Sequence, residues 1–191
     1  MEAYSIRRIA DRMEIQDCIH KFARAVDRRD WALARSVYHE DAVDDHGIYN
    51  GPAENFIEFT KKRHETVLMS MHHVSNITIE FDGDNRALVE SYVFAWQSLS
   101  PSNADMRAAV DKHTTAGDQP LEMLMIARYV DVFTYKNEAW RIQYRQLVYE
   151  SSMKVIPEAT GPDVGNTMKK GRRDHSDPLY ILRGELFQNE K

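Results

Sequence analysis

The sequence predicts an α+β domain in which three N-terminal helices pack on one face of a curved, mixed or antiparallel sheet and enclose a pocket. Two observations predict this class. Apolar residues recur at helical spacing near the start of the chain, whereas the segments after about residue 70 alternate and are rich in Val, Ile, Tyr and Phe. Helices followed by strands, without regular alternation, is the order of α+β folds.

The first helix is expected over about residues 8–28, because its apolar residues follow three- and four-residue spacing and form one stripe. These residues are Ile15, Cys18, Ile19, Phe22, Ala23 and Val26. Asp30 can cap a second helix, Trp31 to Tyr38, and Pro52 can start a third that reaches about Val67. Between them, Asp41 to Gly51 is turn-rich and offers only short strand pieces.

Four strands are expected in the second half of the chain. They are Met71 to Phe81, Ala87 to Trp96, Leu121 to Tyr135 and Ala139 to Ser152. Tight turns join the first pair of strands at residues 82–85 and the last pair at residues 136–138. Residues 98–120 form a long polar connection, with a short helix expected near Ala104–Lys112.

The chain length of 191 residues suits one domain, which we assign to residues 1–153. Residues 154–191 are expected to be an irregular tail that packs on the body or on a neighbouring subunit. An apolar segment at Leu179–Leu186 is the part of the tail most suited to docking. The basic run at residues 169–173 is expected to be solvated or to donate salt bridges to a neighbour.

Composition excludes several classes of partner. The formal net charge of −5 argues against a general nucleic-acid binder, which needs a basic surface to displace counterions. No apolar run approaches the roughly 20 residues that span a bilayer, and the first twelve residues lack the apolar core of a signal peptide. We therefore expect a cytoplasmic protein without a membrane partner.

No metal or cofactor site is expected. The single cysteine, Cys18, excludes an internal disulfide and lies in the helical apolar stripe, which favours a core position. Four residues that could bind a metal, His39, Asp41, Asp45 and His46, match no defined zinc spacing, so a solvated loop is the favoured interpretation. Glycine-rich phosphate loops and nucleophile elbows are absent from the sequence.

Asp27 and His72 are the candidate acid–base residues. Asp27 lies at the margin of the apolar stripe and in the last helical turn, where the helix dipole disfavours a carboxylate, so a functional role or pairing with Arg24 or Arg28 could explain it. His72 stands near the head of a strand, and alternation places it and His73 on opposite faces. Histidine is suited to proton transfer near neutral pH, and Asp27 could orient its ring. The local pattern by itself favours the alternative of a strand-end histidine that is hydrogen-bonded to backbone.

Arg128 lies on an otherwise apolar face of the third strand, so it must be paired or face a polar cavity. We interpret it as an anion-contacting pocket residue or as part of a buried ion pair. The aromatic residues of the strands suit either a ring-shaped hydrophobic ligand or an ordinary core.

These pieces together resemble the SnoaL-like family of the nuclear transport factor 2-like superfamily. The resemblance covers nearly all of residues 7–152. It is carried by IQDCIHKFARAVDRRDWALARSVY, HEDAVDDHGIYNG, MHHVSNITIEFDGD, ARYVDVFTYKNEAWRI and QLVYE. The family implies a cone-shaped barrel around a deep pocket, and homo-oligomers, dimers or trimers, joined through the sheet.

The resemblance also implies site residues. An Asp–His pair acts as the base in the dehydratases and dehydrochlorinases of this superfamily, and it falls on Asp27 and His72 here. The Asn four residues after the histidine is Asn76, the family's strand arginine falls on Arg128, and a dehydratase tyrosine falls near Tyr49. The long connection at residues 99–121 and the tail from Lys154 depart from the small enzymes.

The function expected on these grounds is that of a cofactor-independent lyase or isomerase, resembling a dehydratase, for a hydrophobic cyclic small molecule. Asp27 and His72 would be catalytic, and Arg128, Tyr49 and Asn76 would bind substrate. The alternatives are a non-catalytic small subunit of a ring-hydroxylating dioxygenase and a small-ligand-binding protein of the same fold.

Overall fold

The structure is a computed structural model that describes residues 4–104, 107–108, 119–155 and 168–187. The helix expected near Ala104–Lys112 lies largely outside the described residues, and so does the tail between residues 156 and 167.

The helices and strands follow the predicted order. The helices are α1 (Ile6–Arg28), α2 (Trp31–Ser36), α3 (Ala53–Arg63), the 3₁₀ helix η1 (His64–Thr66) and α5 (Pro178–Leu186). The strands are β1 (Tyr38–Asp45), β2 (Asn50–Pro52), β3 (Val67–Asp82), β4 (Arg86–Leu99), β5 (Leu121–Lys136) and β6 (Ala139–Val155). Strand β6 therefore extends beyond the domain boundary placed at residue 153.

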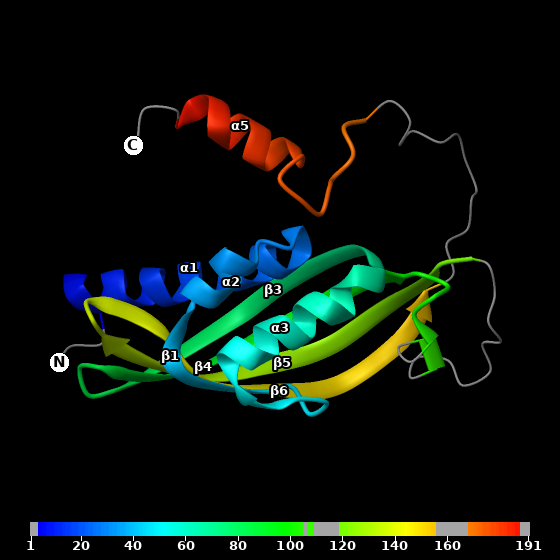
Figure 1. Cartoon of the computed structure of the whole chain (residues 1–191). Coiled ribbons are helices and arrows are strands. Elements are labelled where there is room, and N and C mark those ends of the chain that lie inside the picture. Colours follow the sequence, from blue (N-terminus) through cyan, green and yellow to red (C-terminus); the bar gives the residue numbers. More distant parts are fainter. Residues whose placement is uncertain (1–3, 105–106, 109–118, 156–167, 188–191) are drawn as a thin grey trace.

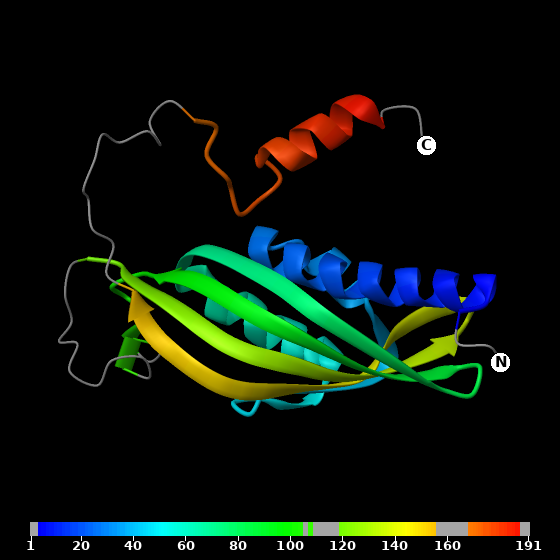
Figure 2. The same cartoon turned by 180° about the vertical axis from the view of Figure 1, so that it is seen from behind.

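The six strands form one sheet in the order β2-β1-β6-β5-β4-β3, in which β1 runs parallel to β6 and the other neighbours are antiparallel. Helices α1, α2 and α3 cover one face of this curved sheet (Figure 1). In the described part of the chain, no helix covers the opposite face (Figure 2). The α+β class with a mixed sheet on three helices is confirmed, but the sheet stays open and does not close into a barrel.

Strand β1 is longer than the short pieces expected between residues 41 and 51, since it spans eight residues. Four acidic residues made this strand difficult to predict from the sequence, because Asp and Glu are depleted in strands. They are Glu40, Asp41, Asp44 and Asp45. The pairing with β6 stabilises this acidic segment as a strand.

The core lies between α1 and the sheet, and it contains a buried ion pair. Ile15, Ile19 and Phe22 of the α1 stripe are buried, as is Cys18, whose pKa is raised by burial to about 12. Arg145 of β6 donates to both carboxylate oxygens of Asp131 of β5, at 2.8 and 2.7 Å, and both side chains are fully buried. The rings of Phe22 and Tyr129 lie 4.4 and 4.0 Å from the guanidinium carbon.

The tail was expected to be irregular, but residues 178–186 form helix α5, with Asp177 as its N-terminal cap. In both views α5 lies beyond α1, on the side away from the sheet (Figures 1 and 2). None of the α5 residues is buried, so the helix contacts the body only lightly.

Removal of one member of the buried ion pair should destabilise the fold. Asp131→Leu leaves the Arg145 guanidinium charged and unpaired in the core, and we expect a loss of about 3–5 kcal/mol in the free energy of unfolding. The double variant Asp131→Leu/Arg145→Met should regain most of this loss, because no buried charge remains. Urea unfolding of both variants measures the effect, and equal stability of the single and double variants contradicts it.

Candidate functional site

Asp27 is held where the C-terminal end of α1 meets the edge of the sheet. Helix α1 ends at Arg28, and Arg29 adopts the left-handed conformation that terminates it. The Asp27 carboxylate is 6% exposed and accepts three hydrogen bonds. They come from the Ser70 hydroxyl at 2.9 Å, the His72 backbone N–H at 2.8 Å and His72 Nδ1 at 2.6 Å.

His72 lies on β3, the edge strand of the sheet, where its backbone N–H has no neighbouring strand to pair with. Asp27 supplies the missing acceptor and also the acceptor for the ring. A ring that donates through Nδ1 to a carboxylate carries its lone pair on Nε2. Nε2 has no hydrogen-bond partner among the described residues, so His72 has the tautomer of a base.

Two opposing effects set the charge of Asp27. Burial raises the pKa of this carboxyl, but the charge of His72 and the hydrogen bonds from His72 and Ser70 outweigh it, so the pKa lies below its ordinary value. Asp27 is therefore ionised at neutral pH and can stabilise an imidazolium when His72 accepts a proton.

His72 lines a cavity of about 350 Å³ between the helices and the sheet, a size typical of small-molecule sites. Most of its wall is apolar and aromatic, with contributions from α1, α3, the loop after β1 and the inner face of β3 to β6. The polar side chains of the wall are His46, Thr60, Arg63, His64, His72 and Gln97. Three histidines thus face one largely apolar hollow.

His46 forms a second histidine–carboxylate pair in this wall. His46 Nδ1 is hydrogen-bonded to Asp44, which is fully buried and also accepts from the Tyr38 hydroxyl at 2.7 Å. The ring stacks on Phe56 with the centroids 4.2 Å apart. The solvated-loop interpretation is therefore wrong for His46, because this residue directly follows β1, stacks on Phe56 and lines the cavity.

His64 was missed by the sequence analysis because η1 has no periodic pattern. It is 5% exposed, and its Nδ1 accepts a hydrogen bond of 2.7 Å from Arg173 of the tail. Burial lowers the pKa of His64 well below its ordinary value, and the charges of Arg173, His72, Arg63 and Arg29 lower it further. The ring is therefore neutral and carries its proton on Nε2.

The structure does not place Arg128 in the cavity. Residues of odd number in β5, such as Tyr129, face the cavity, whereas Arg128 points from the opposite face of the sheet. There it donates to Glu90 at 2.6 Å and to Glu150 at 2.7 Å, and it is only partly buried. Both interpretations made from the sequence are corrected, because its ion pairs lie on the outer face and not in a pocket or in the core.

Tyr49 and Asn76 are also outside the cavity wall. The Tyr49 hydroxyl donates to the carbonyl of Pro52 at 2.8 Å, and its ring packs against Phe56 and Phe59. These contacts stabilise the loop that contains Tyr49. Asn76 is exposed with φ of 49°, at an irregularity in the pairing of β3 with β4. Asn tolerates this left-handed conformation well, so its role here is to shape a β-bulge.

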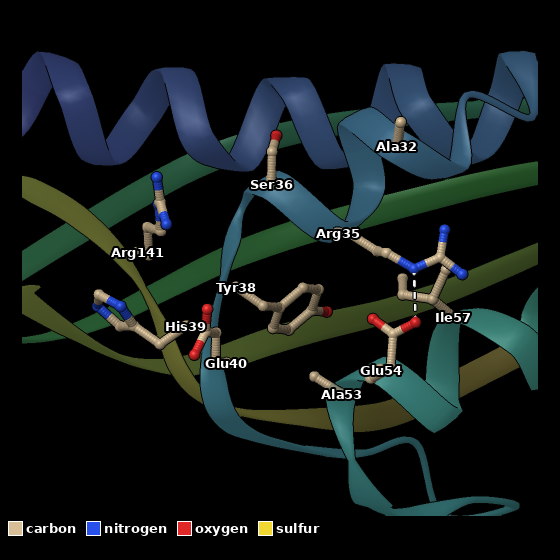
Figure 3. A pocket seen from close by; sticks show the side chains of 10 residues that line it. All are labelled: Ala32, Arg35, Ser36, Tyr38, His39, Glu40, Ala53, Glu54, Ile57 and Arg141. Carbon is tan, nitrogen blue, oxygen red and sulfur yellow. Dashed lines mark hydrogen bonds and ion pairs between the residues drawn. The ribbon is translucent and has the colours of Figure 1, made fainter.

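A second hollow of about 310 Å³ lies between α2, β1 and α3 and is lined by the ten residues drawn in Figure 3. Two of its polar side chains already have partners. Arg35 is paired with Glu54 and Glu58, and His39 Nε2 is hydrogen-bonded to the carbonyl of Thr134 at 2.9 Å. This hollow lacks a base oriented by a carboxylate, so the cavity at His72 is the better candidate.

Two further findings concern the described residues. They contain no group of three or more His, Cys, Asp or Glu side chains placed to hold a metal ion. None of their helices has both the length and the apolar character that a membrane crossing requires.

Comparison with known families identifies the chain. The family model of the SnoaL-like domain matches residues 7–146, which is most of the sequence. The chain belongs to the SnoaL-like family. Among curated proteins, no sequence matches this SnoaL-like chain.

Solved structures share the fold of this SnoaL-like domain. A hexachlorocyclohexane dehydrochlorinase, LinA-type3 of Novosphingobium barchaimii, has a TM-score of 0.64 and 18% identity, covering 82% of this chain and 98% of that one. A protein of Novosphingobium aromaticivorans provisionally named a scytalone dehydratase has a TM-score of 0.63 and 14% identity, covering 83% and 96%. Identities this low establish the fold alone.

The neutral state of buried His64 predicts a loss of stability in mild acid. In the unfolded chain His64 has its ordinary pKa of about 6.5 and is protonated below that pH. In the folded protein it stays neutral, so the free energy of unfolding falls as pH decreases. His64→Asn keeps an acceptor for Arg173 but does not titrate. Urea unfolding at pH 7.5 and 5.5 should show the wild type losing about 1 kcal/mol more than the variant. Equal losses contradict a neutral His64.

Proposed function

We propose that this protein is a cofactor-independent lyase or isomerase that removes a proton from carbon in a hydrophobic cyclic small molecule. The observation that carries the proposal is the 2.6 Å hydrogen bond between Asp27 and His72 Nδ1, because it leaves the basic Nε2 of His72 available at the wall of an apolar cavity. The fold shared with a hexachlorocyclohexane dehydrochlorinase supports the assignment of the substrate as a ring.

In the proposed mechanism, His72 Nε2 takes a proton from an activated C–H bond, and the C–H electron pair stays with the substrate. Asp27 remains ionised and stabilises the imidazolium through Nδ1. In an elimination, the electron pair forms a double bond as a leaving group departs from the neighbouring carbon with its own bonding pair. In an isomerisation, the His72 proton returns to a different carbon.

A second group must assist the leaving group, and Arg128 and Tyr49 lie elsewhere. We assign this role to His46, because Asp44 is placed to stabilise its protonated form in the same wall. A protonated His46 gives its proton to a departing hydroxide, which leaves as water. The two histidine–carboxylate pairs thus divide base and acid between them.

The proton-abstraction step can be tested without knowledge of the natural substrate. Cyclic ketones that lack a leaving group should exchange an activated C–H for deuterium in D₂O, followed by mass spectrometry or NMR. His72→Ala and Asp27→Asn should each lower the exchange rate by about 10²-fold or more. His73→Ala is the matched control, because this neighbour is exposed and faces away from the cavity, and it should exchange at the wild-type rate.

His46→Gln separates the two roles in the same assay. It should retain exchange but lose elimination from substrates with a hydroxide leaving group. Full exchange by the His72 and Asp27 variants contradicts the proposed base. Tight ligand binding by a wild-type protein without exchange favours a binding protein, and co-purification with an iron–sulfur oxygenase subunit favours the dioxygenase small subunit.

We also propose that the protein forms a homo-oligomer, a dimer or trimer, through the uncovered face of the sheet. Met71, Tyr92, Phe94 and Trp96 gather there on β3 and β4, and each is about 40–56% exposed. Trp96→Glu places a charge in this patch and should shift the mass measured by light scattering to that of the monomer. Met13→Glu, on exposed α1, is the control. A monomeric wild type, or an unchanged mass for the Trp96 variant, contradicts the proposal.

A further inference from the structure

We propose that Arg173, which lies in the C-terminal segment beyond the sheet, is a positioning residue that fixes His64 as a neutral hydrogen-bond donor at the cavity wall. His64 then presents Nε2–H to an oxygen or halogen atom of the bound molecule. The identity of that molecule as a cyclic substrate rests on the proposed function, whereas the action of Arg173 on His64 does not.

The Arg173 guanidinium makes four hydrogen bonds to the body of the protein. Nη1 donates to the carbonyl of Val67 at 2.5 Å, and Nε donates to the carbonyl of Asp27 at 3.0 Å. Nη2 donates to the carbonyl of Val26 at 3.1 Å and to His64 Nδ1 at 2.7 Å. A planar guanidinium, with its N–H donors at fixed angles, can reach these four acceptors at once. A lysine ammonium cannot reproduce this geometry.

These partners belong to the three elements that carry the site. Val26 and Asp27 are in the last turn of α1, His64 opens η1, and Val67 begins β3, the strand of His72. Carbonyls at a helix C-terminus lack intrahelical partners and carry partial negative charge, so a cation is favoured there. Arg173 therefore joins the backbone of Asp27, the ring of His64 and the strand of His72.

The contact with His64 has a chemical consequence. Arginine only donates, so Nδ1 must be the lone-pair nitrogen of the ring and Nε2 must carry the proton. His72 has the opposite tautomer, since its Nδ1 donates to Asp27. The cavity is thus lined by one imidazole that can accept a proton and one that can donate a hydrogen bond.

Burial is the largest cause of the lowered pKa of His64, and the charges around the ring add to it. Arg173 comes from the tail, Arg29 from the end of α1, Arg63 from α3 and His72 from β3, and each lowers the pKa of the buried ring. Burial, and after it the charge of Arg29, lowers the pKa of Arg173 itself to about 10, so it stays charged at neutral pH. Loss of the Arg173 charge should therefore let His64 titrate closer to the ordinary range of histidine.

The segment around Arg173 is tied to the C-terminal end of α1 and the start of α2 by polar contacts and not by burial of α5. Arg28 lies 3.4 Å from the Asp177 carboxylate, and the Tyr180 hydroxyl donates to Asp30 at 3.1 Å. Because none of the α5 residues is buried, substitution of Arg173 should change the site without removing a hydrophobic part of the fold.

Nitrogen-15 NMR of histidine-labelled full-length protein tests the proposal directly. The wild type should show a neutral His64 with the proton on Nε2 between pH 5.5 and 8. Arg173→Gln should give mixed tautomers, because Nδ1 loses its charged donor, and Arg173→Lys should restore the charge but not the single tautomer. Arg172→Gln is the matched control, because this neighbour contributes only its backbone N–H to Asp177.

Deuterium exchange with a cyclic ketone supplies the second readout. Arg173→Gln should lower kcat for exchange at least about tenfold, with His64→Phe giving a similar loss and Arg172→Gln none. An unchanged His64 spectrum in Arg173→Gln overturns the positioning role, even if the wild type is active. Absence of exchange in the wild type overturns the proposed function, while altered His64 tautomers in Arg173→Gln still support the positioning role.

Discussion

The hydrogen bonds that Asp27 accepts are the constraint on which the site depends. A carboxylate in the last turn of a helix is disfavoured by the helix dipole, and burial adds a further cost. Three donors offset this cost, and two of them come from His72 on the edge strand. The same contacts therefore satisfy a backbone N–H of the edge strand, attach α1 to the sheet and set the tautomer of the imidazole.

The order of the elements could be predicted because its signals are local. The pairing of Asp27 with His72 was expected from the resemblance to the SnoaL-like family, because local signals alone left both residues with ordinary explanations. Which face of the sheet a strand residue lies on is harder to predict from the sequence. Arg128 stands on an apolar face, but the uncovered side of this sheet is also apolar, so alternation did not reveal which face meets the cavity. Asn76 was misassigned for a related reason, since it lies at an irregularity in the strand that alternation does not anticipate.

The remaining groups of the site depend on contacts between distant parts of the chain. His64 and Arg173 are 109 positions apart, and no periodicity in either segment indicates that they meet. Asp44 and His46 are near neighbours, but the acidic composition of β1 concealed the strand that contains Asp44 and ends just before His46. Polar residues that the sequence places in a solvated loop or in the tail are therefore the hydrogen-bond partners of two cavity histidines, His46 and His64.

The parallel pairing of β1 with β6 has a consequence for folding during translation. Strand β1 pairs with residues of β6 that are synthesised more than a hundred positions later, so the N-terminal helices emerge before the sheet that buries them exists. Arg173 follows later still, after all the residues that line the cavity. Until translation has passed β6, the apolar stripe of α1 therefore has no complete sheet to pack against.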